Sequence, residues 1–235
     1  MKVTTTRNGL RLSQHGVVIS ELRTSEGPTH SVFDVLAALI AVLKPEGCAS
    51  VLGFAGGGMM APLRGLGVKS DLHSVDLDPQ GHELFRRHCP QWSPGVRWTQ
   101  ADAMVWLGEQ PPKFDLLMDD LSVSDGEDVV KPDISWKVLP KLMRRRLKPG
   151  GVAVFNLLSP PGGAWNRALP PLIGSFAQAH VITLDEFENH ILVAGNTLPT
   201  ARELGSSVRR ALRQLRSRQA GRLHIRQVAI RQRSD

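Results

Sequence analysis

Short apolar runs alternate with amphipathic stretches over most of the chain. Five of the runs have the length and composition of buried strands, and they cover residues 50–54, 72–77, 96–99, 114–118 and 152–158. Apolar residues at helical spacing predict helices around them, over residues 31–43, 59–65, 79–88, 103–108 and 134–146. Strands and helices that alternate in this way form a parallel sheet covered on both faces, because a parallel strand pair needs a crossover connection. The pattern therefore predicts an α/β fold.

The N-terminal residues predict a separate β-structure. Asn8-Gly9 lies between two short strand-like segments, and this dipeptide tolerates the two positive φ angles of a type I′ hairpin turn. We therefore expect a small N-terminal β-hairpin unit within residues 1–25. The apolar stretch 16–22 would add a further strand to it.

A second hairpin is predicted near the other end of the sheet. Residues 181–184 and 190–194 are apolar and flank an acidic turn, so we expect them to pair at the sheet edge. With the five earlier strands, this hairpin gives a seven-stranded, Rossmann-like sheet. We assign this sheet and its helices to a central domain of residues 26–199.

The last segment, residues 200–235, is predicted to be a separate basic element. Thr200 and Glu203 have the spacing of a capping box, and the helix that follows has apolar residues on one face and arginines on the other. The segment holds ten arginines against Glu203 and Asp235, a net charge of +8, whereas the other 199 residues hold 19 basic and 20 acidic groups. Residues 223–230 have no helical stripe and would form a terminal strand.

Three interpretations of this basic segment are open. Its apolar face can pack on the body of the protein or on the partner subunit of a homodimer, which leaves the arginines in water. Its arginines can instead bind the phosphates of a nucleic acid or of an anionic membrane. Aromatic residues that would stack on bases are absent from residues 200–235. We therefore expect packing first and keep nucleic acid as the alternative.

The overall composition is that of a globular protein, with 41% hydrophobic and 22% charged residues. The longest apolar run, residues 32–43, is shorter than the ~20 residues that cross a bilayer. No basic N-terminal segment leads into an apolar stretch, and Cys48 and Cys89 have neither a disulfide pattern nor a metal-binding spacing. The histidines of residues 73–88 also lack a matching ligand set, so we expect no metal site. We expect a cytoplasmic protein.

Polar residues recur where the predicted strands end, and open α/β sheets bind ligands at the carboxyl ends of their strands. Three glycines directly follow the first strand, and glycine lets a backbone loop approach a ligand closely. Asp76 ends the next strand, where a carboxylate can accept hydrogen bonds from both hydroxyls of a ribose. Asp102, with the backbone of Ala103, is placed for the exocyclic amine of adenine. The predicted nucleoside-binding residues are Gly56, Gly57, Gly58, Asp76, Asp102 and Ala103.

The same residues have structural interpretations as well. The glycine run can be a tight turn without a ligand, and Asp76, Asp78 or Asp102 can cap the helix that follows it. Gly56-x-Gly58-x-x-Ala61, with an acid about twenty residues later, also fits the dinucleotide fingerprint. A nicotinamide-dependent oxidoreductase is therefore an alternative.

The order of these motifs resembles class I S-adenosylmethionine-dependent methyltransferases, and more closely their spermidine synthase-like branch. The resemblance covers about residues 10–198. It rests on the hairpin, the glycine loop, and the segments Val75-Asp76-Leu77-Asp78, Ala101-Asp102-Ala103, Phe114-Asp115-Leu116-Leu117-Met118-Asp119 and 147–151. It implies a Rossmann-like methyltransferase sheet, with S-adenosylmethionine or its decarboxylated form as the cofactor.

The segments that hold the diamine in aminopropyltransferases of this branch differ here. By this resemblance, Asp119 is the predicted catalytic residue, which accepts or orients the proton of an attacking amine, and His30 and Asp120 are predicted to contact the substrate. The chain has no tyrosine. Where the family has Gly-Gly-Gly-Asp, Tyr-His-Glu and Asp-x-x-Asp, this chain has Gly56-Gly57-Gly58-Met59, Thr29-His30-Ser31 and Asp119-Asp120-Leu121-Ser122.

These differences favour methyl transfer to an unidentified small acceptor over aminopropyl transfer in polyamine biosynthesis. Six acids against Lys131 alone between residues 119 and 133 predict an acidic loop beside the pocket. Such a loop would attract a cationic amine acceptor, although acidic loops are also commonly just solvated. The alternative from a different class is a non-catalytic protein of methyltransferase fold whose basic tail binds nucleic acid.

Overall fold

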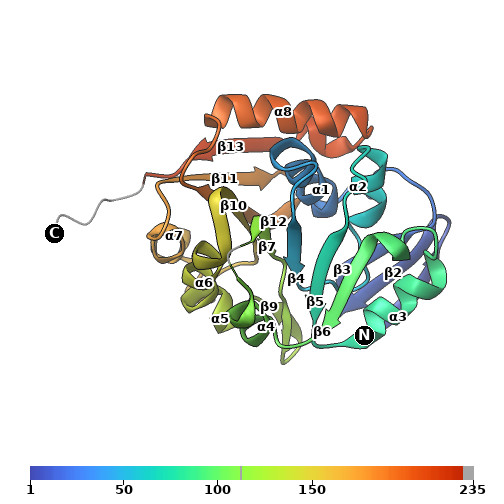
Figure 1. Cartoon of the computed structure of the whole chain (residues 1–235). Coiled ribbons are helices and arrows are strands. Elements are labelled where there is room, and N and C mark those ends of the chain that lie inside the picture. Colours follow the sequence, from blue (N-terminus) through green and yellow to red (C-terminus); the bar gives the residue numbers. More distant parts are fainter. Residues whose placement is uncertain (112, 230–235) are drawn as a thin grey trace.

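Eight strands form the main sheet of the computed structural model, which describes residues 1–111 and 113–229 (Figure 1). In spatial order the strands are β13 (Leu223–Gln227), β11 (Gln178–Leu184), β12 (Phe187–Gly195), β10 (Leu147–Leu157), β7 (Phe114–Asp119), β4 (Ala49–Leu52), β5 (Leu72–Asp76) and β6 (Val96–Gln100). The strands from β10 to β6 are parallel, and β12, β11 and β13 each pair antiparallel with their neighbours. The predicted α/β fold is confirmed.

The prediction of seven strands in the main sheet was wrong by one. The predicted hairpin of β11 and β12 is present, but β13 pairs with β11 and forms the edge of the sheet. Leu223 of β13 is 2% exposed, and this side chain belongs to the apolar core that α8 (Ala201–Gln214) covers. The extra strand therefore satisfies the backbone groups of β11 and buries apolar surface at the same time.

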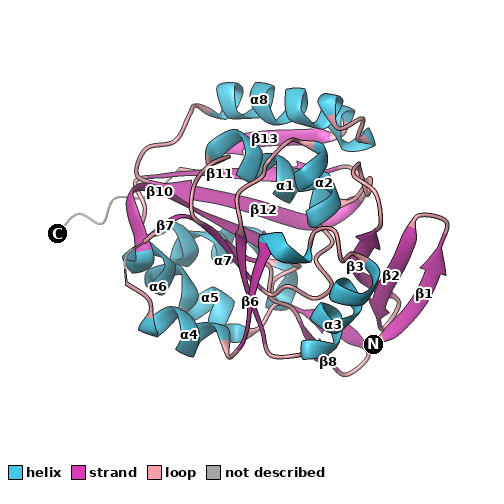
Figure 2. Ribbon diagram, turned by 45° about the vertical axis from the view of Figure 1, so that its right-hand side comes forward, coloured by secondary structure: helices cyan, strands magenta, loops and turns pink. Residues whose placement is uncertain are grey.

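Helices cover both faces of the sheet (Figure 2). Both faces need cover because apolar side chains point to both sides along β10. Val152 and Val154 point into one apolar core, and Ala153 and Phe155 point into the other. The first core is covered by α1 (Val32–Leu43), α2 (Met60–Gly65), α3 (Pro79–His88) and α8. The second core is covered by α4 (Ala103–Glu109), α5 (Asp133–Lys137), α6 (Leu139–Arg146) and α7 (Trp165–Ile173).

The single helix predicted over residues 134–146 is two helices, α5 and α6. Pro140 lies in the first turn of α6. Proline has no N–H to donate to the preceding turn and its ring crowds the carbonyl there, so α5 ends at Lys137 and α6 begins at Leu139. Three short 3₁₀ segments complete the helical part: η1 (Ser93–Gly95), η2 (Pro161–Gly163) and η3 (Arg218–Gly221).

The N-terminal unit has three strands, β1 (Lys2–Thr6), β2 (Gly9–Gln14) and β3 (Val17–Arg23), so the predicted hairpin and the further strand predicted from residues 16–22 are both present. Leu12 and Leu22 are buried and join the same apolar core as α1. This packing holds β3 in the small sheet and fixes the sheet on the main body. A further hairpin of β8 (Val123–Asp125) and β9 (Asp128–Val130), not predicted, carries part of the acidic loop.

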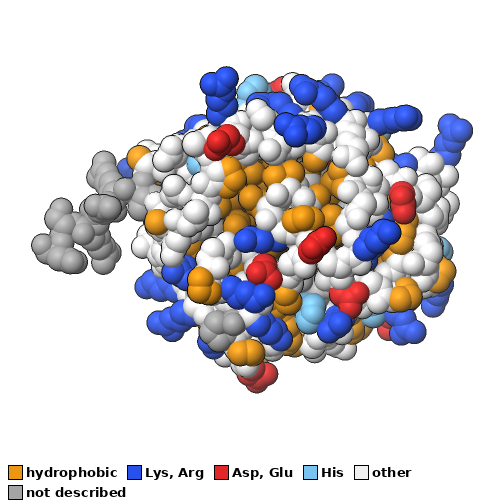
Figure 3. All heavy atoms as spheres, turned by 45° about the horizontal axis from the view of Figure 1, so that its top comes forward, with side chains coloured by type: hydrophobic (Ala, Val, Ile, Leu, Met, Phe, Trp, Pro, Cys, Tyr) orange, Lys and Arg blue, Asp and Glu red, His pale blue; other side chains and the backbone are white. Residues whose placement is uncertain are grey.

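Within its described residues, 200–229, the basic segment packs on the body of the protein. Leu204, Val208 and Leu212 of α8 are fully buried in the core that also contains α1. The predicted capping box is present, because the Thr200 hydroxyl accepts from Glu203 N–H and the Glu203 carboxylate accepts from Thr200 N–H. Lys and Arg side chains gather over α8 at the surface (Figure 3). No helix in the described part of the chain is long and apolar enough to span a bilayer.

Candidate active site

A pocket of about 360 Å³ lies at the carboxyl ends of β4, β5, β7 and β10. The N-terminal sheet contributes Gln14 and residues 17–19 to its wall, and the start of α1 contributes Ser31 and Phe33. The remaining polar residues of the wall are Asp76, Asp78, Asp120, Ser122, Asn156 and Asn189. The location agrees with the expected ligand site of an open α/β sheet.

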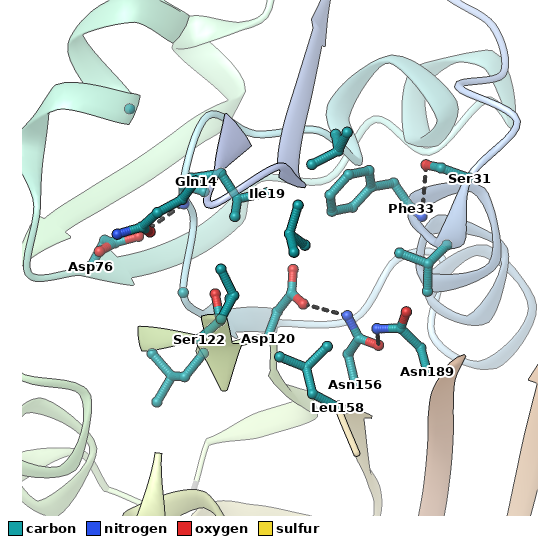
Figure 4. Close-up of a pocket in the computed structure, with 18 of the residues that line it drawn as sticks. Gln14, Ile19, Ser31, Phe33, Asp76, Asp120, Ser122, Asn156, Leu158 and Asn189 are labelled. Carbon is teal, nitrogen blue, oxygen red and sulfur yellow. Dashed lines mark hydrogen bonds between the residues drawn. The ribbon is translucent and has the colours of Figure 1, made fainter. Parts of the chain in front are cut away.

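Asp76 lies at one end of this pocket (Figure 4). Its Oδ2 accepts N–H groups from Phe54 at 2.9 Å and from Ala55 at 2.8 Å, and its Oδ1 accepts from Asp78 N–H at 3.1 Å. Asp76 therefore fixes the loop after β4 against the end of β5. Each carboxylate oxygen has a further lone pair, so the side chain can also accept hydrogen bonds from a ligand. Asp78 caps α3 by accepting Gln80 N–H at 2.9 Å.

None of the three predicted glycines lines the main pocket, since Gly56 and Gly58 pack against the N-terminal sheet and α1, and Gly57 packs against the rings of Phe54 and Phe85. A Cβ on Gly56 would lie 2.5 Å from the Leu22 side chain, and a Cβ on Gly58 would lie 3.0 Å from the Phe33 ring. The glycines allow close packing of the protein on itself at these positions. The parts of this loop that do face the pocket are Gly53 and Ala55.

Asp102 and Ala103 also lie outside the residues that line the pocket. The Asp102 side chain accepts Met104 N–H and Val105 N–H, both at 2.9 Å, and so caps the N-terminus of α4. This is the structural interpretation considered for Asp102 in the sequence. Its predicted contact with adenine stays a prediction.

Asp119 is fully buried at the end of β7 and is not part of the pocket wall. Its Oδ1 lies 2.8 Å from Lys131 Nζ, and both side chains are almost without exposure, at 0% and 1%. Lys131 also donates to the Asp119 carbonyl oxygen at 3.1 Å. The pair ties the loop directly after β9 to the end of β7.

Of the two adjacent aspartates, Asp119 and Asp120, it is Asp120 whose carboxylate faces the pocket (Figure 4). Its Oδ1 accepts a hydrogen bond from Asn156 Nδ2 at 2.7 Å. Burial raises the pKa of Asp120 to about 6, against the hydrogen bond from Asn156 and the charge of Lys131, which both lower it. A carboxylate with a pKa near 6 can accept a proton at neutral pH and bind it more tightly than an ordinary aspartate does.

His30 precedes α1, but its neighbour Ser31 is the residue that lines the pocket. The His30 ring accepts Arg218 N–H through Nδ1 at 3.4 Å, and its carbonyl oxygen accepts Gln219 Nε2 at 2.8 Å. His30 therefore joins the start of α1 to η3. Its predicted contact with substrate stays a prediction.

The electrostatic character of the pocket is acidic. Asp76, Asp78 and Asp120 line it, and no Lys, Arg or His is among the described residues of its wall. The rest of the acidic loop contributes less than the sequence count suggests, because Lys131 pairs with Asp119 and Lys137 pairs with Asp133. No cluster of three or more His, Cys, Asp or Glu side chains suited to a metal ion occurs within residues 1–111 and 113–229.

Asn156 and Asn189 are pocket residues that were not predicted from the sequence. Both line the pocket, and Asn189 Nδ2 donates to Asn156 Oδ1 at 2.9 Å. Asn156 is the one amide in the apolar run of β10, which is a signal that the sequence did offer. Asn189 follows an acidic turn and has no comparable signal.

Solved structures match this chain, whereas no protein-family model and no curated protein does. Human Methyltransferase-like protein 13 in complex with SAH has a TM-score of 0.58 and 22% identity, over 78% of this chain and 90% of that chain. A spermidine synthase in complex with the transition state analogue AdoDATO has a TM-score of 0.60 and 12% identity, over 85% and 74% of the two chains. Spermidine synthase from Thermotoga maritima has a TM-score of 0.56 and 14% identity, over 73% and 60%.

These likenesses and the strand order define the fold of class I S-adenosylmethionine-dependent methyltransferases, which the spermidine synthases share. The resemblance noted in the sequence is therefore confirmed at the level of the fold. This chain has β13 at the edge of its main sheet and a three-stranded sheet at its N-terminus.

Proposed function

We propose that the protein is a transferase that binds S-adenosylmethionine in this pocket and transfers its methyl group to a small acceptor. The observation that carries the proposal is an acidic pocket at the carboxyl ends of β4, β5 and β7, with Asp76 and Asp120 in its wall. The cofactor would supply an electrophilic carbon on a positively charged sulfonium. Carboxylates in a wall that carries no Lys, Arg or His side chain among its described residues suit such a charge.

In this proposal Asp76 accepts hydrogen bonds from the ribose hydroxyls. Its hold on Phe54 N–H and Ala55 N–H keeps the loop after β4 in place, so the carboxylate is oriented before a ligand arrives. Gly53 and Ala55 supply the backbone surface next to it. The human protein with the same fold binds SAH, which supports a nucleoside of this type.

Asp120, rather than Asp119, has the proton-transfer role in this proposal. A new bond forms between the acceptor atom and the methyl carbon, the carbon–sulfur bond breaks, and the sulfur keeps the electron pair as a neutral thioether. The acceptor loses one proton, and Asp120, directly after β7, is a carboxylate in the pocket wall that can take it. Its raised pKa, about 6, suits that step.

Aminopropyl transfer is the second candidate. The described wall of the pocket has no Lys, Arg or His side chain to pair with the carboxylate of intact S-adenosylmethionine, and the decarboxylated form lacks that group. Two spermidine synthases have the same fold. Met59, which replaces an acid of that family, is 4% exposed and lies outside the main pocket, which favours methyl transfer.

Calorimetric titration of the purified chain with S-adenosylmethionine and with its decarboxylated form, at one salt concentration, tests the proposal. We expect intact S-adenosylmethionine to bind more tightly, and a preference for the decarboxylated form would support the second candidate. Asp76→Asn should weaken binding at least tenfold, since a hydrogen bond to a charged group contributes roughly 1.5–3 kcal/mol.

Asp71→Asn is the matched control for this titration. Asp71 directly precedes β5, at the opposite end of the strand from Asp76, and pairs with Arg97 at the surface. Its replacement should leave the affinity unchanged. Binding of neither sulfonium compound would contradict the proposed function, and a parallel titration with NAD tests the oxidoreductase alternative.

A further inference from the structure

A chain of side-chain hydrogen bonds crosses three neighbouring strands and ends on Asp120 (Figure 4). Asn189 of β12 donates through Nδ2 to Asn156 Oδ1 at 2.9 Å. Asn156 of β10 donates in turn through Nδ2 to Asp120 Oδ1 at 2.7 Å. No described residue donates a hydrogen bond to the second carboxylate oxygen of Asp120, so one oxygen is held and the other is available to the pocket.

The strand register places these three side chains together. Phe155 lies opposite Asp119 in the parallel pair of β10 and β7, so Asn156 and Asp120 are the next residues along and share the other face. Asn156 lies opposite Ile191 in the antiparallel pair with β12. Asn189, two residues before Ile191, is therefore a diagonal neighbour of Asn156 on the same face.

The direction of the chain is set at Asp120, whose carboxylate only accepts, and it is supported by Asn189. An asparagine amide can present either its NH₂ or its carbonyl oxygen to a neighbour. Asn189 donates to the carbonyl oxygen of Asn156, which leaves the NH₂ of Asn156 for Asp120. A carboxylate accepts from this NH₂, whereas it would be repelled by the carbonyl oxygen.

We propose that Asn156 and Asn189 are positioning residues that hold the Asp120 carboxylate in one orientation, with one oxygen free for the acceptor group. Asn156 contacts Asp120 directly, and Asn189 acts through Asn156 by donating to its carbonyl oxygen, which favours the direction in which the Asn156 NH₂ faces Asp120. This inference deepens the proposed function, because it takes Asp120 as the proton acceptor of that site.

The pKa of Asp120 reports on this arrangement without any cofactor. Burial raises the pKa, and the N–H of Asn156 is the strongest influence that lowers it. The charged groups around Asp120 are Lys131, which lowers the pKa, and Asp119 and Asp76, which raise it. A variant that loses the Asn156 hydrogen bond should therefore raise the pKa of Asp120 further.

The test is a carbon-13 NMR titration of the aspartate carboxyl groups in the unliganded full chain, with Asp120 assigned by its loss in Asp120→Asn. We expect Asp120 of the unaltered chain to titrate near pH 6, and Asn156→Leu to move its pKa up by about one unit. Asn189→Leu should move it in the same direction, because the Asn156 amide is then free to turn. Asn189→Gln keeps an NH₂ donor and should restore most of the original value.

Asn166→Leu, at an exposed position of α7, is the control for introducing leucine and should leave the titration unchanged. If Asn156→Leu fails to fold, the two Asn189 variants still decide the question. An unchanged pKa of Asp120 in Asn189→Leu overturns the inference, as does an unchanged value in a folded Asn156→Leu.

Calorimetry with S-adenosylmethionine on the same variants separates this inference from the proposed function. A shifted pKa in a protein that binds no sulfonium compound supports the positioning role and contradicts the function. An unshifted pKa in a protein that does bind overturns the positioning role alone. A shifted pKa together with binding supports both.

Discussion

The two adjacent aspartates at the end of β7 have opposite environments. Side chains alternate along a strand, so Leu117 and Asp119 point to the face covered by α4 and α6, while Met118 and Asp120 point to the face that opens into the pocket. On the first face the carboxylate needs a buried partner, and Lys131 supplies it. On the second face the carboxylate remains available to a ligand.

Loss of Lys131 should lower the free energy of unfolding far more than loss of an exposed lysine does. Lys131→Met leaves the Asp119 charge buried without a partner, which costs about 3–5 kcal/mol of the free energy of unfolding. Adding Asp119→Asn should restore part of this loss. Urea denaturation measures both, and Lys137→Met, which breaks an exposed pair with Asp133, should cause no measurable change.

Asp120→Asn should stabilise the protein above pH 6. The folded-state pKa of Asp120, about 6, is above its ordinary value of 3.8, so folding takes up a proton between these values. This proton uptake stabilises the folded protein, and its contribution to the free energy of unfolding is complete below about pH 4. The contribution is lost as the pH rises through 6, by up to about 3 kcal/mol. Urea denaturation from pH 4 to pH 8 should show that the free energy of unfolding of Asp120→Asn exceeds that of the unaltered protein by an amount that grows with pH. A difference that stays constant with pH would contradict the prediction.

Between elements, the closest approach near the site is that of α3 to the loop after β4. A Cβ on Gly81 would lie 1.5 Å from the Ala55 carbonyl oxygen, and both residues line the pocket. The contact brings the start of α3 against the loop that Asp76 holds through its backbone. Glycine at this position therefore sets the distance between two walls of the pocket.

Gly81→Ala should destabilise the protein even though alanine favours helices. The added methyl group must displace backbone, and overpacking of this kind costs about 1–3 kcal/mol. Gly108→Ala in α4 is the matched control, since nothing lies within 4 Å of its Cβ position, and it should stabilise by about 0.5–1 kcal/mol. Thermal unfolding of the two variants should show shifts of opposite sign.

At the scale of the whole molecule, both ends of the chain complete the central fold. The N-terminal sheet forms one wall of the pocket and packs on the glycine loop. The C-terminal segment covers α1 with α8 and extends the sheet with β13. The division into residues 1–25, 26–199 and 200–235 stays a prediction, but the last segment shares its apolar core with the central part.

The two faces of α8 should differ in their effect on stability. Leu212 is fully buried, so Leu212→Ala should cost about 2–5 kcal/mol. Arg213 is exposed on the other face, and Arg213→Gln should leave the free energy of unfolding unchanged. If urea denaturation showed the same loss in the free energy of unfolding for both variants, the arginine face would also be packed. Arginine variants of this kind, unlike deletion of the segment, can test the nucleic-acid alternative in a folded protein.

The sequence by itself determined the α/β class, the succession of strands and helices along the chain, the capped basic helix and the position of Asp76 at the end of a strand. Each of these depends on local periodicity or on residues that follow one another in the chain. The pocket wall depends on contacts between distant segments. Strand register turned Asp120 and Asn156 toward the pocket and Asp119 toward Lys131, and packing of the N-terminal sheet occupied the space beside Gly56. Only the tertiary structure decides which of several suitable carboxylates remains free, because burial and pairing are properties of the assembled sheet.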